Sequence, residues 1–378
     1  MTTTLINGRV LTPHGLRDGL AVVVEGGRIS EVCPAASAPS GARKEDLGGA
    51  TLVPGFIDVQ VNGGGGVLFN DDPSVEAIAA IGAAHARFGT TGFLPTLISE
   101  DLETISRAIG AARQAAARGV PGVLGVHIEG PFLSTEKKGV HDASKFRTLD
   151  EKALELLTSP GAGRTLVTLA PETTTPDMIR RLVSAGVIVA AGHTNATYAQ
   201  TRAALDAGLS GFTHLFNAMS QLTAREPGAV GAALDDQASW CGLIVDGRHV
   251  DPVTLRIARR AKPLDKLMLV TDAMPTVGAE APTFILQGRA IEARDGVLIA
   301  PDGALAGSSL NMMQAVRNAI AMMGLTIEQA VAAASAHPAQ FLGLPDAGAI
   351  VRGGRACFAL LDAQLEVSRT WIDGAQTY

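Results

Sequence analysis

The chain has 378 residues, of which 47% are hydrophobic and 18% are charged, and its formal net charge is −6. This length and composition predict a folded protein with one large domain and a small accessory domain. Because the chain is acidic and has no basic run, nucleic acids and anionic membrane surfaces are not expected partners. No apolar run approaches the length of a membrane span, and we expect no signal peptide at the N-terminus.

Three cysteines are scattered along the sequence without the spacing of a metal-binding or redox motif. They are Cys33, Cys241 and Cys357. Their odd number also argues against a disulfide framework. We therefore expect a protein of a reducing compartment, in the cytoplasm.

Both ends of the sequence consist of short strand patterns separated by turns. Residues 1–52 contain apolar pairs and runs between turn pairs such as Asn7-Gly8, which are typical of hairpin connections. Residues 346–378 show the same pattern of short apolar runs separated by turns, with a turn pair at Asp373-Gly374. Because the termini of a domain often lie close together, we predict that the two ends build one small β-sandwich.

Residues 53–345 alternate between apolar strand patterns and helical patterns. The eight strand candidates are Phe56–Val61, Gly92–Leu97, Val123–Glu129, Leu166–Leu169, Val187–Ala191, Gly211–His214, Cys241–Val245 and Lys266–Val270. Helical patterns between them include Ser74–Phe88, Leu102–Arg118, Pro176–Ala185, Thr197–Ala207 and Pro252–Arg260. Eight strand–helix units in series predict an α/β fold, a parallel (β/α)8 or TIM barrel.

Polar residues stand where several of the predicted strands end. Glu129 ends the third strand, and Asp272 follows the eighth. His193 follows the fifth strand and His214 ends the sixth. In a (β/α)8 barrel the C-terminal strand ends form one mouth, so these residues would converge although they are far apart in sequence. One histidine of this kind is more often structural, but two imidazoles with a carboxylate can hold a divalent metal, and Asp272 can then act as general base.

Eight motifs, all in the same order along the chain, resemble one family of enzymes. They are Pro54–Gly66 (PGFIDVQVNGGGG), Gly125–Leu133 (GVHIEGPFL), Ala191–Thr197 (AGHTNAT), Thr213–Met219 (THLFNAM), Arg225–Gly228 (REPG), Asp246–Asp251 (DGRHVD), Leu269–Ala273 (LVTDA) and Leu305–Ser309 (LAGSS). On these motifs the chain resembles the N-acetylglucosamine-6-phosphate deacetylases of the amidohydrolase superfamily. The resemblance implies hydrolysis of N-acetylglucosamine 6-phosphate to glucosamine 6-phosphate and acetate. It also implies a (β/α)8 barrel beside a β-sandwich from both termini.

The resemblance assigns a metal ion to Glu129, His193 and His214. Many members of the superfamily bind a second metal through a His-x-His pair at the end of the first strand, where this chain has Gln60 and Asn62. Amides are poor ligands for a transition metal, so we predict a site with a single metal ion. Zinc is the expected ion, and nitrogen and oxygen ligands also suit iron or another divalent ion.

The resemblance also implies which residues bind the sugar phosphate and cleave the amide. Asp272 would serve as acid and base, and His141 would contact the sugar and polarise the acetyl carbonyl. Arg225 and His249 would reach the phosphate from a neighbouring subunit, which implies a homodimer; without the motif, Arg225 is typical of a solvated arginine at a helix start. The implied substrate-binding residues are Val140, His141, Asn217, Ala218, Arg225, Asp246, Gly247, Arg248, His249, Ala306, Gly307 and Ser308. The family often has a serine where Ala306 stands, so a side-chain hydrogen bond would be missing there.

Two further features of the sequence have more than one interpretation. His127 lies two residues before Glu129 on the same strand face, so it either supports that ligand or simply packs in the core. The segment Ala273–Pro282 follows Asp272 directly and is either a mobile lid or a plain loop. We expect the other histidines outside the motifs to be structural: His14, His85 and His337.

Two other functions stay open from the sequence. The same machinery would suit N-acetylgalactosamine 6-phosphate or another N-acylated sugar phosphate, because the choice of sugar epimer depends on a few loop contacts. The alternative of another class is an inactive scaffold with an amidohydrolase fold. The intact ligand positions and Asp272 argue against a scaffold.

Overall fold

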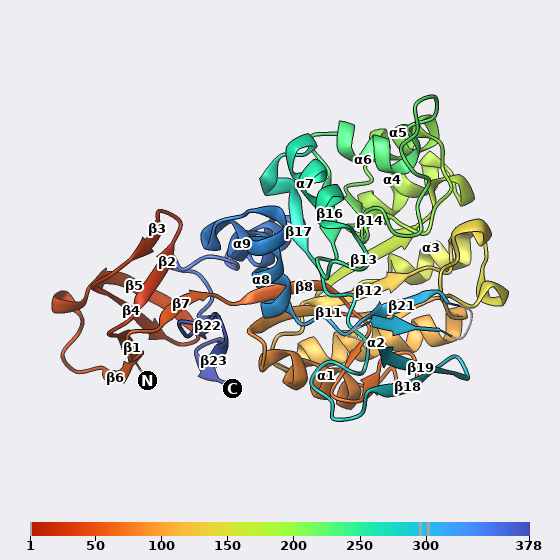
Figure 1. Cartoon of the computed structure of the whole chain (residues 1–378). Helices are drawn as coiled ribbons and strands as arrows, with labels where there is room; N and C mark the ends of the chain where they lie inside the picture. Colours follow the sequence, from red (N-terminus) through yellow and green to blue (C-terminus); the bar gives the residue numbers. More distant parts are fainter. Residues whose placement is uncertain (1, 295–296, 301–302) are drawn as a thin grey trace.

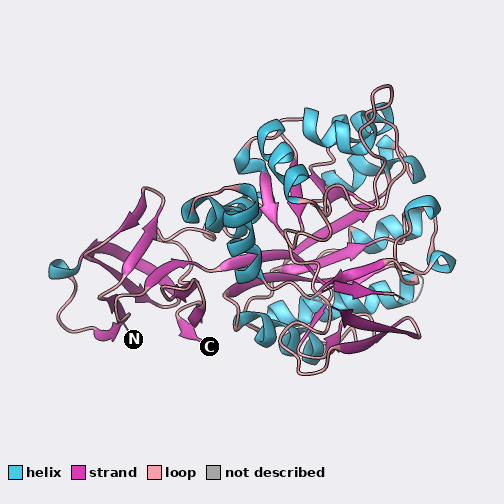
Figure 2. Ribbon diagram, viewed as in Figure 1, coloured by secondary structure: helices cyan, strands magenta, loops and turns pink. Residues whose placement is uncertain are grey.

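The computed structural model describes residues 2–294, 297–300 and 303–378. Figure 1 shows a large barrel beside a smaller β domain, in which both chain ends lie. In the barrel the strands are inside and the helices are outside (Figure 2). This arrangement confirms the predicted (β/α)8 barrel with a β-sandwich built from both termini.

Two sheets form the β domain. One sheet has the order β5 (Arg28–Pro34), β4 (Leu20–Glu25), β1 (Thr2–Ile6) and β6 (Arg43–Asp46). The other has the order β24 (Ala375–Gln376), β23 (Val367–Ile372), β22 (Phe358–Leu361), β7 (Thr51–Pro54), β2 (Arg9–Thr12) and β3 (Gly15–Arg17). β7 crosses the boundary predicted between residues 52 and 53 and pairs antiparallel with β22, so the C-terminal strands join the N-terminal ones. Buried side chains such as Val22, Leu52 and Trp371 form the core between the two sheets.

The barrel sheet contains eight strands, and every neighbouring pair in it is parallel. The strands are β8 (Phe56–Val61), β11 (Thr90–Ile98), β12 (Gly125–Glu129), β13 (Arg164–Leu169), β14 (Ile188–Ala191), β15 (Gly211–Phe212), β16 (Trp240–Leu243) and β17 (Leu267–Leu269). Each corresponds to one of the eight strands predicted from the sequence. A short hairpin, β9 (Gly63–Gly64) and β10 (Val67–Leu68), follows the first barrel strand.

The barrel closes between β8 and the residues that follow β17. The backbone N–H of Asp272 donates to the carbonyl oxygen of Gln60 at 3.0 Å, and the N–H of Asn62 donates to that of Ala273 at 2.9 Å. Val61 and Ala273 form a parallel bridge at the same place. The seam of the barrel therefore fixes the backbone of Asp272 beside the end of the first strand.

One helix follows each barrel strand and packs outside the sheet (Figure 2). These helices are α1 (Val75–Ala86), α2 (Leu102–Ala117), α3 (Glu151–Leu157), α4 (Pro176–Ser184), α5 (Tyr198–Asp206), α6 (Gly228–Asp235), α7 (Pro252–Ala261) and α8 (Met312–Met323). Two more, α9 (Ile327–Ala334) and α10 (Ala336–Phe341), lead back toward the β domain. All five predicted helices are present, whereas α3, α6 and α8 were not predicted. α6 lacks a side-chain N-cap and consists largely of glycine and alanine, so it has no clear sequence signature.

A small antiparallel sheet lies between β17 and α8 and was not predicted from the sequence. Its strands are β18 (Thr283–Leu286), β19 (Arg289–Arg294), β20 (Val297–Ile299) and β21 (Leu305–Ser308). The buried face, with Leu286, Ile291 and Leu298, packs against Ile98 and Val140 at the barrel mouth. We call these four strands the cover sheet, because they lie over one side of the mouth.

The segment Ala273–Pro282 connects the barrel to the cover sheet. It contains no helix or strand, and Met274 and Val277 in it are buried. The backbone N–H of Met274 donates to the carbonyl oxygen of Ser308 at 3.0 Å. The backbone N–H of Gly65 donates to the carbonyl oxygen of Val277 at 2.7 Å. The segment is thus a packed connection at the seam, and the cover over the mouth comes from the sheet that follows it.

Across the described ranges, no helix combines the length and apolar character that crossing a bilayer requires.

A carboxyl group is buried in the barrel beside the seam. Asp58 of β8 accepts a hydrogen bond from the Thr271 hydroxyl at 2.5 Å, and further bonds from the N–H groups of Gln60 and Thr271 at 3.2 and 3.3 Å. Burial raises the pKa of Asp58 to about 7, although these hydrogen bonds act in the opposite direction. In the unfolded chain this carboxyl group returns to its ordinary pKa of about 3.9.

This pKa difference predicts a pH-dependent effect of Asp58→Asn. The folded chain binds the Asp58 proton more tightly, so the contribution of this group to stability is present below about pH 4 and is lost as the pH rises through about 7. Asparagine does not titrate. We therefore expect the Tm deficit of Asp58→Asn, measured on metal-free protein, to be smaller at pH 8 than at pH 5.

Asp18→Asn is the matched control, because the Asp18 side chain is 81% exposed. Its small effect on Tm is expected to be the same at both pH values. An equal deficit of Asp58→Asn at pH 5 and pH 8 would contradict the assigned pKa.

Candidate active site

A cavity of about 360 Å³ opens at the C-terminal ends of the barrel strands. The strand ends contribute Glu129, His193, His214 and Asp272 to its wall. In the cover sheet, β21 contributes Leu305 and Gly307, and Ala304 lies directly before that strand. The loop after β12 contributes Gly139, Val140 and His141. This is the face where catalytic residues of (β/α)8 enzymes gather.

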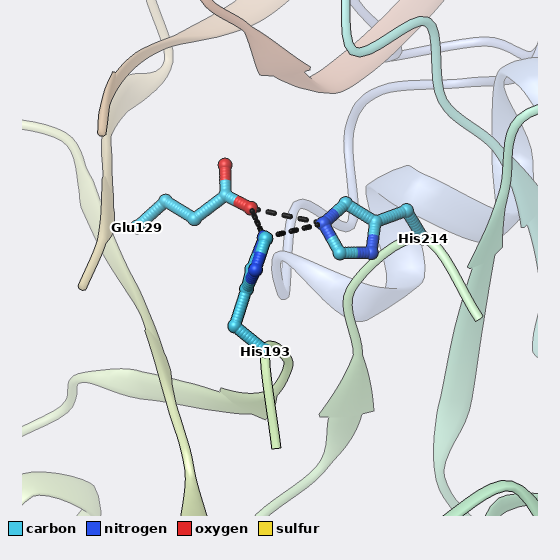
Figure 3. A group of neighbouring side chains, drawn as sticks. All are labelled: Glu129, His193 and His214. Atoms are coloured by element: carbon cyan, nitrogen blue, oxygen red, sulfur yellow. Dashed lines mark hydrogen bonds and ion pairs between the residues drawn. The ribbon is translucent and has the colours of Figure 1, made fainter. Parts of the chain in front are cut away.

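Three buried side chains converge at the base of the cavity (Figure 3). Glu129 Oε1 lies 3.0 Å from Nε2 of His214 and 3.2 Å from Nε2 of His193, and the two nitrogens are 3.1 Å apart. Ligand atoms around a tetrahedral zinc ion, with bonds of about 2.0–2.1 Å, lie about 3.3 Å from one another. The donor types and the spacing therefore fit one divalent metal ion with room for a further ligand.

The surrounding chain keeps these donors in the state that a metal requires. Nδ1 of His193 lies 2.8 Å from the carbonyl oxygen of Lys137, which can only accept, so the proton is on Nδ1 and Nε2 has a free lone pair. Burial alone would raise the pKa of Glu129, but the imidazole rings of His193 and His214 beside it hold it well below its usual value. Glu129 is therefore a carboxylate.

Asp272 is held next to this group by two amides. Asn62 Nδ2 donates to Asp272 Oδ1 at 2.6 Å, and Gln60 Nε2 donates to the same oxygen at 3.1 Å. Gln60 Nε2 also donates to Glu129 Oε2 at 3.0 Å, so one amide joins the two carboxyl groups. Burial, together with the charge of Glu129, raises the pKa of Asp272 to about 6. Asp272 thus binds a proton more tightly than Glu129 does. This difference suits Glu129 to bind a metal as a carboxylate and Asp272 to exchange a proton.

The backbone at three of these positions is left-handed. The φ angles of His193, His214 and Asp272 are +48°, +33° and +52°. Non-glycine residues adopt this region at a cost of about 1–3 kcal/mol each, and such residues cluster at functional sites. Here the turn at each strand end directs the side chain into the mouth instead of along the strand.

His141 lies against the metal group on the cavity side. The residue is 3% exposed, and the centroid of its ring is 4.3 Å from that of the His193 ring. Burial and the neighbouring His193 hold the pKa of His141 well below its usual value. The ring is therefore neutral and is suited to hydrogen bonding instead of charge pairing.

His249 also lines the cavity. Its Nδ1 lies 2.6 Å from Asp246 Oδ2, and Asp246 Oδ1 accepts the N–H groups of Arg248 and His249, both at 2.8 Å. That His249 reaches the site of a neighbouring subunit stays a prediction. The Asp246 carboxylate holds the ring over the cavity of its own chain.

Comparison with known protein families gives a match for the barrel part of the chain and for its N-terminal part. Residues 51–377 match the model of the amidohydrolase family, and residues 4–52 match the NagA composite domain. The chain belongs to the amidohydrolase family. This confirms the resemblance found in the sequence motifs.

Relatives of known name cover almost the whole chain. It is 42% identical to an N-acetylgalactosamine-6-phosphate deacetylase of Shewanella sp. (strain ANA-3), over 98% of this chain and 94% of that protein. It is 36% identical to an N-acetylglucosamine-6-phosphate deacetylase of Haemophilus influenzae, over 99% of each. The crystal structure of N-acetylglucosamine-6-phosphate deacetylase from Pasteurella multocida has a TM-score of 0.96 and 35% sequence identity, over 100% of this chain and 99% of that one.

Most of the predicted site residues of this amidohydrolase line the same cavity at the barrel mouth. They are Glu129, Val140, His141, His193, His214, Asn217, Ala218, His249, Asp272 and Gly307. Asp246 lies behind His249, and Gly247 is its neighbour in that loop. Arg225 and Arg248 are exposed outside the cavity.

The side chains of two residues of β21, Ala306 and Ser308, do not face the cavity, so their assignment as substrate-binding residues stays a prediction that concerns their backbone. The side chain of Ala306 is fully buried in the core of the cover sheet. Ser308 donates its hydroxyl proton to the carbonyl oxygen of Thr271 at 2.5 Å. Because side chains alternate along a strand, Gly307 between them is the residue that faces the mouth.

Sequence reasoning missed most of the apolar and loop residues of the wall. These are Ile98, Glu136, Lys137, Gly139, Ile244, Met274, Ala304 and Leu305. Ile98 and Ile244 end or follow barrel strands, so their positions were visible in the strand pattern. An apolar side chain has no chemical signature of its own, however, and Leu305 reaches the cavity only through the cover sheet.

Three of the remaining histidines are buried and make contacts in the core. Nε2 of His127 lies 2.7 Å from the Thr168 hydroxyl inside the barrel, and burial lowers the pKa of His127 to about 4. It therefore packs in the core and makes no bond to Glu129. His85 and His337 contact the carbonyl oxygens of Gly63 and Leu267, at 2.9 and 2.7 Å.

The convergence of three donors predicts how substitution changes metal binding. After dialysis against Zn²⁺, we expect about one ion per wild-type chain and far less than one in His214→Ala, because two ligands do not close a tetrahedral site. Elemental analysis of the purified proteins measures the ratio. His14→Ala, at an exposed histidine, is the control and should retain full occupancy; full occupancy in His214→Ala would reject the assigned ligands.

Proposed function

We propose that this protein hydrolyses the N-acetyl group of N-acetyl-D-glucosamine 6-phosphate, giving D-glucosamine 6-phosphate and acetate in amino-sugar metabolism. The observation that carries the proposal is the position of Asp272, a buried acid with a pKa raised to about 6, beside three convergent metal-ligating side chains. The names and coverage of the relatives from Haemophilus influenzae and Pasteurella multocida supply the substrate class.

We infer that Glu129, His193 and His214 hold one zinc ion per chain, and that iron or another divalent ion can replace it. Such an ion supplies polarisation of the acetyl carbonyl and a lowered pKa for the attacking water. The amides of Gln60 and Asn62 are bonded to the carboxyl groups of Asp272 and Glu129, which supports a single ion.

The proton moves through Asp272. The hydrogen bonds from Gln60 and Asn62 end on Oδ1, which leaves Oδ2 to accept a proton from water as the new C–O bond forms. Asp272 then returns that proton to the sugar nitrogen as the C–N bond breaks and acetate leaves. His141 faces the acetyl oxygen and donates a hydrogen bond to it while negative charge develops there.

We further propose that the phosphate lies near Asn217, the Ala218 backbone and His249. Arg225 is exposed in the single chain, and Leu222, three residues earlier, is 57% exposed. This supports a homodimer in which Arg225 completes the phosphate site of the second copy, where its planar charged fork suits phosphate. A monomer in sedimentation velocity at assay concentration would contradict this arrangement.

N-acetylgalactosamine 6-phosphate is the second candidate substrate. It is favoured by the relative from Shewanella, which is named for that sugar and is 42% identical over 374 residues. The two sugars differ only in the orientation of one hydroxyl group. An inactive scaffold is disfavoured, because a scaffold has no need for three convergent ligands and a buried acid.

The decisive experiment measures acetate release from both N-acetylhexosamine 6-phosphates and from unphosphorylated N-acetylglucosamine. We expect the highest kcat/KM on N-acetylglucosamine 6-phosphate, loss of activity with a chelator, and recovery with Zn²⁺. A higher kcat/KM on the galactosamine epimer would select the second candidate. No acetate from either phosphate would reject the deacetylase.

Asp272→Asn tests the acid–base role. Asparagine keeps the shape but cannot accept the proton, so we expect kcat to fall by at least about 100-fold. Metal content should be unchanged, since Asp272 is not a ligand. Asp18→Asn should retain wild-type turnover, and near-normal turnover of Asp272→Asn would exclude it as the base.

A further inference from the structure

The two ring nitrogens of His141 have different surroundings. Nδ1 lies 2.8 Å from the hydroxyl oxygen of Ser99 and accepts a hydrogen bond from the backbone N–H of Ser99 at 3.3 Å. The ring itself lines the cavity. Within the described part of the chain, no residue makes a hydrogen bond to Nε2, so that nitrogen is left for a substrate atom.

The backbone N–H of Ser99 decides which nitrogen carries the proton. A hydroxyl group can donate or accept, so the contact with Ser99 Oγ alone permits either tautomer of His141. A backbone N–H can only donate, and it therefore requires a lone pair on Nδ1. A proton on Nδ1 would set two N–H groups against each other, so the neutral ring has its proton on Nε2.

We propose that Ser99 is a positioning residue: it fixes His141 in the tautomer that presents an Nε2–H donor to the cavity. The assigned tautomer does not depend on the proposed function. Only the identity of the acceptor, the acetyl oxygen of the substrate, rests on it. His141 then serves as a neutral hydrogen-bond donor to the developing oxyanion, and Asp272 remains the one base for the attacking water.

The position of Ser99 in the barrel explains why its N–H is available. β11 ends at Ile98, which is paired with Glu129 of β12. Ser99 is the next residue, beyond the last paired position of that ladder, so its N–H points to His141 instead of into the sheet. The same strand pair thus places one metal ligand and the group that orients His141.

The glycine after Glu129 makes room for the Ser99 hydroxyl. Gly130 has φ +87°, and a Cβ atom there would lie 2.3 Å from Ser99 Oγ. On the other side, Arg289 of the cover sheet donates to the carbonyl oxygen of Val140 at 2.9 Å and so holds the backbone just before His141. Ring and backbone of His141 are therefore fixed from two different elements.

The spectroscopic test is the ring-nitrogen NMR of the full-length protein labelled with ¹⁵N-histidine, with and without one equivalent of Zn²⁺. His141→Gln identifies the signals of this residue. We expect a protonated Nε2 and an unprotonated Nδ1. A protonated Nδ1, alone or together with Nε2, would overturn the proposal, and neither result depends on which substrate the protein cleaves.

A double-mutant cycle tests whether Ser99 acts through His141. Ser99→Ala removes the hydroxyl but keeps the N–H, and we expect kcat to fall about five- to tenfold, with KM little changed. In the His141→Gln background the same substitution should have no further effect. Equal losses in both backgrounds would mean a merely structural role and would reject the proposal.

Ser106→Ala, at an exposed serine of α2, is the matched control and should leave both parameters unchanged. The cycle uses whichever sugar phosphate the protein cleaves. If the protein cleaves neither sugar phosphate, the proposed function is rejected. The NMR measurement of the His141 tautomer then still tests the proposed role of Ser99.

Discussion

The site depends on how the barrel closes. The N–H of Asp272 bonds to Gln60 of the first strand, and its carbonyl oxygen accepts the N–H of Ser308 at 2.9 Å. Asp272 is thus fixed between the first barrel strand and the last strand of the cover sheet. The residue that titrates is built into the seam itself, so its position follows from the closure and not from a flexible loop.

This closure brings two carboxyl groups together and gives them opposite properties. Burial favours the neutral form of both, but Glu129 lies against the imidazole rings of His193 and His214, and its pKa falls. Burial and the charge of the nearby Glu129 act more strongly on Asp272 than its amide donors and the rings of His214 and His249, and its pKa rises to about 6. The side-chain amide of Gln60 donates to both carboxyl groups and so holds them close together.

The cover sheet completes the site from outside the barrel. Its apolar face packs on the mouth, and Arg289 reaches the carbonyl oxygen before His141. Ser99, at the end of the second barrel strand, holds the ring of the same histidine. His141 therefore connects the barrel and the cover sheet, which explains how a loop residue keeps a defined orientation in a buried site.

Local patterns in the sequence determined the eight strands, five of the helices and the polar strand ends, because alternation, helix caps and the position of Glu129 or His214 are properties of short segments. They also determined that both ends of the chain are β-rich. Motifs added the family and the expected roles of His141 and the substrate-binding residues.

Only the tertiary structure decided the cover sheet, the orientation of His249 and the contact of Ser99 with His141. Each depends on contacts between segments far apart in the chain: the sheet on packing over the mouth, His249 on Asp246 and the cavity it faces, and Ser99 on a histidine 42 residues away. No local pattern of residues encodes which donor meets which acceptor across the barrel, since that choice is made when the strands close.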